Sequence, residues 1–172
     1  MTSRSTESVL RELEQAGLHV DRVVGASIGS VVATLHAAGM DAEEIEERLY
    51  AEFVRRNPFA DWRFPSRSLA KGARVRAALE RNLGADAMIE GFPRQLRVVS
   101  TDLVSRTRVV HRRGNATDAV CSSVRLPVLF APVPDPDGRL LVDGGVLDNL
   151  PTDLLVERDE GPVVAVIISM GG

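Results

Sequence analysis

The stretch that decides the fold is residues 20–39, which read VDRVVGASIGSVVATLHAAG. The stretch from His19 to Val24 predicts a short strand that ends at Gly25. After the turn, apolar side chains recur with the i, i+3, i+4 and i+7 spacing of an amphipathic helix, and Gly39 is a typical stop signal. A strand, a tight turn and a helix therefore follow one another with almost no linker.

The turn itself, Gly25-Ala26-Ser27-Ile28-Gly29, matches the pattern G-x-S-x-G. A nucleophile elbow has this pattern when a strand enters it and a helix leaves it, as is predicted here. The glycines permit a sharp turn, and the free N–H groups at the start of the helix favour a developing anion beside the serine. Ser27 is therefore a candidate nucleophile. The same residues also suit a Gly/Ser loop in which Ser27 only caps the helix.

A serine nucleophile needs a base, which in most enzymes is a histidine. The chain has three histidines, His19, His36 and His111. His36 falls about two turns along the helix after Ser27, and His19 falls near the start of the incoming strand, on the wrong side of the sheet. No histidine follows His111, whereas the α/β-hydrolase order needs one late in the chain. We therefore expect surface or structural roles for all three.

A carboxylate is the remaining candidate base. The predicted strand Leu140 to Val142 leads directly into Asp143-Gly144-Gly145, so an acid is presented at a strand end beside a glycine turn. A carboxylate with an ordinary pKa of about 3.9 is a weak base at neutral pH, and a dry pocket would raise its proton affinity. Asp143 also suits a β-turn in which the aspartate only caps its own backbone.

Composition limits the class of protein. The chain has 172 residues, the length of one domain, of which 44% are apolar and 26% charged, as is typical of a soluble globular fold. A net charge of −3 and an aromatic content of 4% do not favour nucleic acid as a partner. The single cysteine excludes an intrachain disulfide, and no apolar run approaches the ~18 residues of a membrane span. The cysteine and histidines show no metal-ligand spacing, and we expect a cytoplasmic protein.

The rest of the chain alternates helices and strands. Asp41 is expected to cap a helix, with Glu44 at the reciprocal position. Further helices are expected at residues 8–16, 69–83 and 117–124, and strands at residues 96–100, 107–111, 140–142 and 163–168. The strands at 96–100 and 107–111 are expected to form a hairpin or to be neighbours across a bend. The strand at 163–168 is expected to be a buried central strand. This order predicts one three-layer α/β/α domain over residues 1–172 with a largely parallel central sheet.

Together these segments resemble the patatin-like phospholipase family, and most of all its bacterial branch related to neuropathy target esterase. The matching blocks, in chain order, are residues 9–17 (VLRELEQAG), 20–29 (VDRVVGASIG), 100–103 (STDL), 109–114 (VVHRRG), 123–132 (SVRLPVLFAP) and 141–151 (LVDGGVLDNLP). They cover nearly the whole chain. The resemblance implies a patatin-like hydrolase fold and a serine esterase of lipid metabolism.

The family uses a Ser–Asp dyad, so the resemblance implies that Ser27 attacks an ester carbonyl and that Asp143 takes its proton, with no metal and no cofactor. The implied substrates are phospholipids, lysophospholipids or other fatty acyl esters, and peripheral contact with a membrane is expected. The loop with Phe59, Trp62 and Phe64 is a candidate wall for an acyl chain or a lipid contact, although ordinary packing suits these aromatic side chains as well.

The sequence departs from the family pattern in three places. The stretch before Val9 has no glycine, so the first strand and its glycine-rich oxyanion loop are expected to be missing, which leaves the N–H of Ile28 as a donor. Arg125 stands where the family has a small or weakly polar residue, and it is expected to pair with an acid such as Asp143 or Asp148. The chain stops at Gly172, soon after the last predicted strand, so we expect a domain that is incomplete at both ends.

Two other functions remain to be weighed. A non-catalytic remnant or fragment of such an enzyme would keep the fold and bind lipid without turnover, and the glycine-rich loop is the feature that discriminates between this alternative and an active enzyme. Residues 25–29 disfavour a P-loop or dinucleotide-binding protein, because they lack both the Gly-Lys-Ser/Thr ending and the G-x-G-x-x-G spacing.

Overall fold

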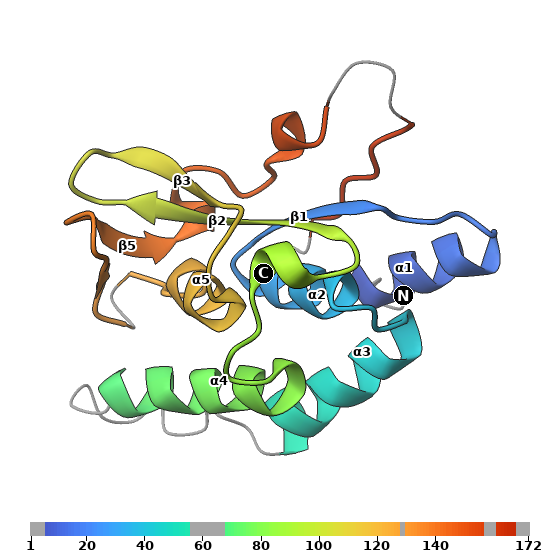
Figure 1. The fold of residues 1–172 in the computed structure, drawn as a ribbon, viewed down its shortest axis with the longest axis horizontal. Coiled ribbons are helices and arrows are strands. Elements are labelled where there is room, and N and C mark those ends of the chain that lie inside the picture. Colours follow the sequence, from blue (N-terminus) through green and yellow to red (C-terminus); the bar gives the residue numbers. More distant parts are fainter. Residues whose placement is uncertain (1–5, 56–67, 128–129, 157–160, 168–172) are drawn as a thin grey trace, which may run out of the picture.

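The computed structural model describes residues 6–55, 68–127, 130–156 and 161–167 (Figure 1). Within them, one sheet contains β1 (Arg22–Ala26), β2 (Gln95–Asp102), β3 (Thr107–His111), β4 (Val133–Pro134) and β5 (Leu140–Asp143). The α-helices are α1 (Thr6–Gln15), α2 (Ile28–Ala37), α3 (Ala42–Leu49), α4 (Ser68–Leu83) and α5 (Ala116–Ser123). A π-helical turn, Tyr50–Arg55, follows α3, and 3₁₀ turns lie at Ile89–Gly91 (η3), Gly144–Val146 (η4) and Thr152–Leu154 (η5). The predicted helices are all present within a few residues of their expected bounds.

β2 is the centre of the sheet. β1 pairs with β2 in parallel, β3 and β5 pair with it antiparallel, and β4 pairs antiparallel with β5. The α/β class and the predicted hairpin are confirmed, but the sheet is mixed rather than largely parallel. For two of the three antiparallel pairs the cause is the length of the connection, because residues 103–106 join β2 to β3 and residues 135–139 join β4 to β5. Such short links cannot make the crossover that a parallel pair requires.

β1 and β5 meet end to end along one edge of β2. β3 covers the opposite edge over residues 98–102, so β1, which pairs with residues 95–99, and β5, which pairs with residues 100–102, must share the remaining edge. They run in opposite directions, and their carboxyl ends therefore face each other. Ala26 pairs with Val99, and Asp143 pairs with the next residue, Ser100. This arrangement brings two chain segments distant in sequence to a single junction.

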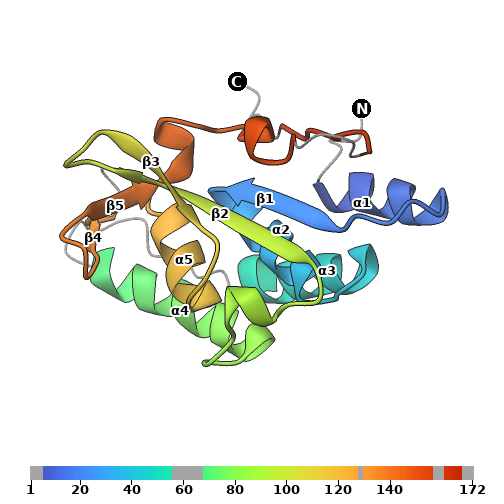
Figure 2. The same ribbon diagram turned by 45° about the horizontal axis from the view of Figure 1, so that its top comes forward.

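The α-helices lie on one face of the sheet (Figure 1, Figure 2). The main core lies between them and the sheet, and its fully buried members include Ala37, Ala42, Ile45, Val98, Ala116 and Val120. A smaller cluster on the other face contains Ala26, Val99 and Leu154. In the described part of the chain, the layer over that face consists of 3₁₀ turns and the extended residues 161–167, where the three-layer expectation placed helices.

Residues 163–167 do not form the predicted central strand. They are extended without ladder partners, and Val164 and Ile167 are 52% and 60% exposed. An apolar run indicates that a segment suits a buried strand, but a strand exists only where another backbone lies alongside it. Ile168 lies outside the described residues. The two-residue strand β4, which contains Pro134, has too little alternation to be predicted.

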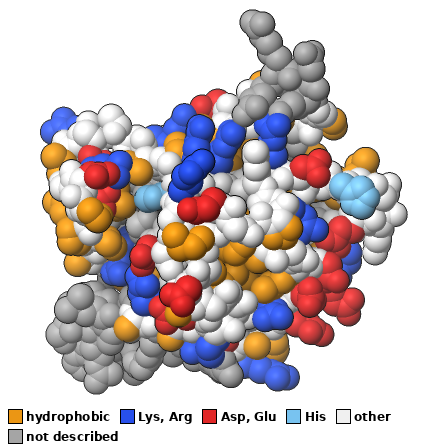
Figure 3. Space-filling view, viewed as in Figure 1, with side chains coloured by type: hydrophobic (Ala, Val, Ile, Leu, Met, Phe, Trp, Pro, Cys, Tyr) orange, Lys and Arg blue, Asp and Glu red, His pale blue; other side chains and the backbone are white. Residues whose placement is uncertain are grey.

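Local signals at the helix ends are confirmed. The Asp41 side chain accepts the N–H of Glu44 at 2.8 Å, and the Glu44 carboxylate accepts the N–H of Asp41 at 3.3 Å. α3 is acidic on its exposed side, and Figure 3 shows acidic side chains gathered there. No helix among the described residues has both the length and the apolar character needed to cross a bilayer.

Candidate active site

Ser27 and Asp143 meet at the junction of β1 and β5. Ser27 directly follows β1, and Asp143 is the last residue of β5, 116 positions further along the chain. The Ser27 hydroxyl donates a hydrogen bond of 2.6 Å to Oδ2 of Asp143. A serine and a carboxylate at this distance can exchange a proton directly. The structure therefore brings together the two candidate residues that the glycine turns indicated.

The backbone of Ser27 is strained. Its φ of 52° and ψ of −134° lie in a region that residues with a side chain rarely adopt. Gly25 makes the sharp turn possible, because a Cβ there would lie 2.5 Å from the Gly29 carbonyl oxygen and from Cα of Ser30. Ser27 occupies the N-cap position of α2, yet its side chain makes no capping hydrogen bond. The turn thus directs the hydroxyl toward Asp143 and leaves the N–H groups at the start of α2 uncapped by it.

Backbone and side-chain contacts hold the turn on both sides of Ser27. Its carbonyl oxygen accepts the N–H and the hydroxyl of Ser30 at 2.9 and 2.6 Å. Its N–H donates to the hydroxyl of Ser123, in α5, at 3.0 Å. Sequence analysis did not single out Ser123, because no local pattern links it to a turn 96 residues earlier.

Asp143 is buried and has few hydrogen-bond donors. It is 2% exposed, and its Oδ1 accepts the N–H of Gly145 at 2.8 Å while Oδ2 accepts the hydroxyl of Ser27. Burial raises the pKa of Asp143 above its usual 3.8, and the two hydrogen bonds only partly oppose that effect. One oxygen of Asp143 therefore caps its own turn, as the turn interpretation predicts, and the other accepts the hydroxyl of Ser27.

Gly144 allows the acid turn to fold against β2. A Cβ at Gly144 would overlap the carbonyl oxygen of Val99 and lie 3.2 Å from Cβ of Ala26. The Val99 carbonyl also accepts the Ser123 hydroxyl at 2.6 Å. The Val99 carbonyl group thus contacts both the acid turn, at Gly144, and Ser123, the residue that accepts the Ser27 N–H.

His111 and His36 take no part in the hydrogen bond between Ser27 and Asp143. Nε2 of His111 is 3.0 Å from the Ser100 hydroxyl and 3.4 Å from that of Ser122, and burial lowers the pKa of His111. His36 is 3% exposed within α2, and burial lowers its pKa as well. The contacts of His111 and the burial of His36 fit the structural roles expected for these two residues. Among the described residues, no group of three or more His, Cys, Asp or Glu side chains is arranged to hold a metal ion.

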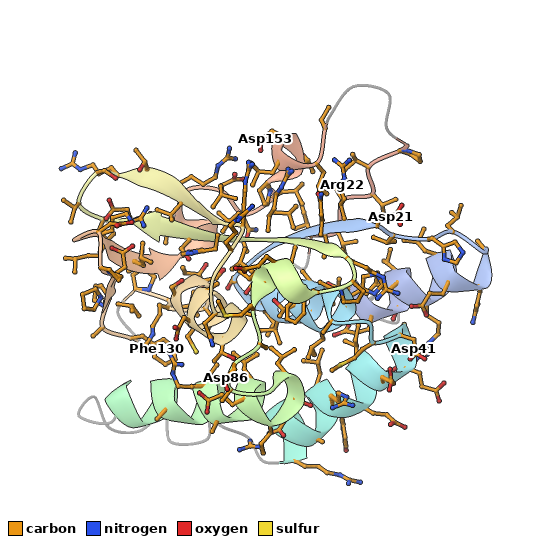
Figure 4. All side chains as sticks on the ribbon, viewed as in Figure 1. Asp21, Arg22, Asp41, Asp86, Phe130 and Asp153 are labelled. Carbon is orange, nitrogen blue, oxygen red and sulfur yellow. The ribbon has the colours of Figure 1, made fainter. Side chains whose placement is uncertain are left out.

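The expected ion pair of Arg125 with an acid of this site is wrong. Its guanidinium lies over the ring of Phe130, 5.8 Å from the centroid (Figure 4). Both side chains line a small cleft between α4 and α5. Only the backbone of Arg125 reaches the acid turn, where its carbonyl accepts the N–H of Asp143 at 2.9 Å. Asp148 pairs instead with Arg108, which also binds Asp153 at 2.8 Å.

A backbone N–H group at the start of α2 and several apolar side chains adjoin the pair in sequence. Ile28 is the first residue of α2, and the first N–H groups of a helix have no acceptor within it. Its side chain is 45% exposed, and Val146 and Leu147, which follow the acid turn, are 48% and 52% exposed. The aromatic residues 59, 62 and 64 lie outside the described residues, as does the stretch before residue 6.

Comparisons with known proteins find similarity over most of the chain. The family model described as patatin-like phospholipase matches residues 8–156. An uncharacterized NTE family protein of Mycobacterium tuberculosis is 34% identical over 158 residues, which are 92% of this chain and 27% of that protein. Patatin-like phospholipase domain-containing protein 6 of Homo sapiens is 33% identical over 168 residues, which are 95% of this chain and 12% of that protein.

The fold has a counterpart among solved structures. The crystal structure of VipD from Legionella pneumophila matches with a TM-score of 0.60 at 16% sequence identity, and the match covers 88% of this chain and 45% of that one. At this identity the likeness concerns the fold alone. The chain spans about a quarter of the length of the mycobacterial relative and a smaller share of the human one.

Proposed function

Since the chain belongs to the patatin-like phospholipase family, we propose that it is a serine lipid acyl hydrolase of phospholipase A, lysophospholipase or carboxylesterase type. The family consists of carboxylic ester hydrolases that act on lipids. The observation that carries the proposal for this chain is the 2.6 Å hydrogen bond from the hydroxyl of Ser27 to Asp143. We assign Ser27 as the nucleophile and Asp143 as the base.

The proposed reaction has two halves. Asp143 takes the proton of the Ser27 hydroxyl while the oxygen attacks the ester carbonyl carbon, and it then gives that proton to the departing alcohol. The product of this half is an acyl ester on Ser27. Water attacks this ester while Asp143 accepts its proton, and the same proton returns to Ser27 as the fatty acid leaves. Burial of Asp143 supports the role, because it raises the proton affinity of a side chain that is otherwise a weak base.

The start of α2 supports the charge that develops on the carbonyl oxygen. The N–H of Ile28 lies at the positive end of the helix, next to the nucleophile in the chain. A backbone donor at this place is the usual partner of an oxyanion after a nucleophile elbow. We propose it as one donor of the oxyanion site.

The proposed substrates are fatty acyl esters, including phospholipids and lysophospholipids. The exposed apolar side chains of Ile28, Val146 and Leu147 adjoin the pair in sequence and suit an acyl chain rather than a polar acyl group. Peripheral contact with a membrane, a cytoplasmic location and independence from metal and cofactor belong to the same proposal.

Labelling with a fluorophosphonate tests it. We expect stoichiometric labelling of Ser27, read by intact mass and peptide mapping, and none in Ser27→Ala. Ser105→Ala is a matched control, because this serine lies in the loop after β2 and bonds to Asp102 and Thr107. Failure to label a chain shown to be folded by circular dichroism would favour the non-catalytic alternative. Assays with lysophosphatidylcholine and with p-nitrophenyl esters of increasing length then define the substrate class.

A further inference from the structure

Two adjacent serines at the end of α5 are buried, but they have different partners. Ser122 is 1% exposed and Ser123 is fully buried. The Ser122 hydroxyl donates to the carbonyl of Ala119 at 2.7 Å and lies 2.8 Å from the hydroxyl of Ser100. The Ser123 hydroxyl contacts the junction between β1 and β5. The pair is therefore a natural comparison within one turn of helix.

The Ser123 hydroxyl connects the elbow to the central strand. It donates its proton to the Val99 carbonyl at 2.6 Å and accepts the N–H of Ser27 at 3.0 Å. A hydroxyl has one proton to donate, so the bond to Val99 orients its lone pairs toward Ser27. Val99 is the β2 partner of Ala26, the residue before Ser27. The Ser123 hydroxyl therefore links the Ser27 backbone to the same position of β2 that pairs with the end of β1.

The strained backbone of Ser27 needs such a contact. A residue with a side chain persists at a φ of 52° only where its surroundings hold it there. The carbonyl side of Ser27 is held by Ser30, within the elbow itself, whereas the N–H side is held from another helix. Loss of that acceptor would leave the N–H unpaired at a part-buried site, which favours relaxation of the turn.

We propose that Ser123 is a positioning residue, whose hydroxyl holds the Ser27 backbone in the conformation that directs the Ser27 side chain at Asp143. The inference rests on the proposed function of Ser27 as nucleophile. It also has a consequence for the oxyanion: the N–H of Ser27 is engaged by Ser123, so the donor next to the nucleophile is the N–H of Ile28.

Ser123→Ala and Ser122→Ala test the assignment as a matched pair. Both remove one buried hydroxyl from the same turn of α5, and both are measured well below the lower of their melting temperatures. In Ser123→Ala we expect the second-order rate of fluorophosphonate labelling to fall roughly 10- to 100-fold, as expected for a displaced reacting group. We expect kcat for an ester to fall with KM within about twofold, since binding contacts are unchanged. In Ser122→Ala we expect both to stay within about threefold of wild type.

Amide hydrogen exchange of Ser27 reports on the elbow without any turnover. We expect exchange of this amide to accelerate at least about tenfold in Ser123→Ala and not in Ser122→Ala, because only the first removes its acceptor. If Ser123→Ala leaves either the Ser27 exchange rate or the labelling rate at the wild-type level, or if Ser122→Ala slows labelling equally, the assignment is overturned. A wild-type chain that does not label would refute the proposed function separately, and the exchange comparison would still decide whether Ser123 holds the elbow.

A second pair keeps the test decisive if the alanine variant does not fold. Ser123→Thr and Ser123→Val introduce side chains of nearly equal volume, and only threonine retains the hydroxyl. We expect the threonine variant to protect the Ser27 amide and to label faster than the valine variant by roughly tenfold or more. Equal behaviour of the two would overturn the role of the hydroxyl.

Discussion

Two buried aspartates end neighbouring strands of the same sheet, and their surroundings differ. Asp102 ends β2 and Asp143 ends β5, and each is 2% exposed. Asp102 accepts the hydroxyl of Ser105 and three backbone N–H groups, from Val104, Ser105 and Leu140, at 2.5 to 3.1 Å. Asp143 accepts one hydroxyl and one N–H group. Their exposed fractions are therefore equal, whereas the number of hydrogen-bond donors differs.

Donor number and the strength of the burial effect together move the two pKa values in opposite directions. The Ser105 hydroxyl and then the backbone N–H groups lower the pKa of Asp102 to about 2, although burial opposes them. For Asp143, burial outweighs its two hydrogen bonds and raises the pKa. A carboxylate surrounded by donors holds a turn and stays ionised, whereas one with few donors retains affinity for a proton. The comparison indicates which aspartate can act as a base.

Exchanging each aspartate for asparagine gives the largest expected effect. Asp143→Asn should lower the rate of Ser27 labelling and of ester hydrolysis on the order of 10³-fold or more, because the amide cannot accept the proton. Asp102→Asn should leave the labelling rate within about threefold of wild type, since it contacts neither Ser27 nor Asp143. Labelling kinetics at neutral pH measure both.

The two variants should rank in the opposite order when their thermal stability is compared. Asp102→Asn loses acceptor capacity for its donors and should lower the melting temperature by several degrees, whereas Asp143→Asn should hold or raise it. An Asp143→Asn chain that melts far below wild type would contradict the idea that its ionised side chain is disfavoured in the fold.

The two turns after these aspartates also differ in their need for glycine. Gly144→Ala should destabilise the fold by about 3 kcal/mol or more, because the new Cβ overlaps the Val99 carbonyl of β2. In the turn after Asp102, Arg106 adopts a φ of 57°, so Arg106→Gly should stay within about 1 kcal/mol of wild type. Urea unfolding measures both, and a Gly144→Ala chain as stable as wild type would contradict the described acid turn.

The two pKa directions predict separate pH windows. Labelling of Ser27 should follow the ionised fraction of Asp143, so its rate should fall about tenfold per pH unit below a midpoint that lies above 3.8. Because that pKa is raised in the fold, stability should decrease as pH rises from 3.8 through it, and Asp143→Asn should remove this decrease. The contribution of Asp102 to stability should depend on pH in the opposite direction. Its stabilisation is present above its unfolded pKa and is lost as pH falls toward about 2. A labelling midpoint at or below 3.8 would contradict the assignment of Asp143 as base.

Much of the fold could be predicted because its elements depend on local patterns. The helix after Ser27, the cap at Asp41 and the hairpin over residues 96–111 each follow from neighbours within a few positions. Pairing between segments that are distant in the sequence cannot be predicted from such local patterns. The apolar residues 163–167 were expected to be a central strand, and the structure leaves them without a ladder partner.

The site divides in the same way. Ser27 and Asp143 each stand in a glycine turn that is visible in the sequence, while their contact depends on β1 and β5 sharing one edge of β2. Ser123 and Arg108 have no such local signal, because their partners lie 96 and 40 residues away. The side chain of Arg125 could not be placed from charge alone, since Phe130 offers its cation an aromatic face.

The smallest expected effect comes from removing one donor from Asp102. Ser105→Ala eliminates the hydrogen bond that contributes most to its low pKa, and three backbone N–H groups remain. We expect the pKa of Asp102 to rise but to stay below 3.8, and the acid unfolding midpoint to move upward. The melting temperature at neutral pH should fall less than in Asp102→Asn, and labelling of Ser27 should be unchanged. If Ser105→Ala shifted the pH midpoint of labelling instead, the two carboxylates would be coupled. The hydrogen-bond donors around each aspartate would then not be sufficient to explain the proton affinity of that aspartate.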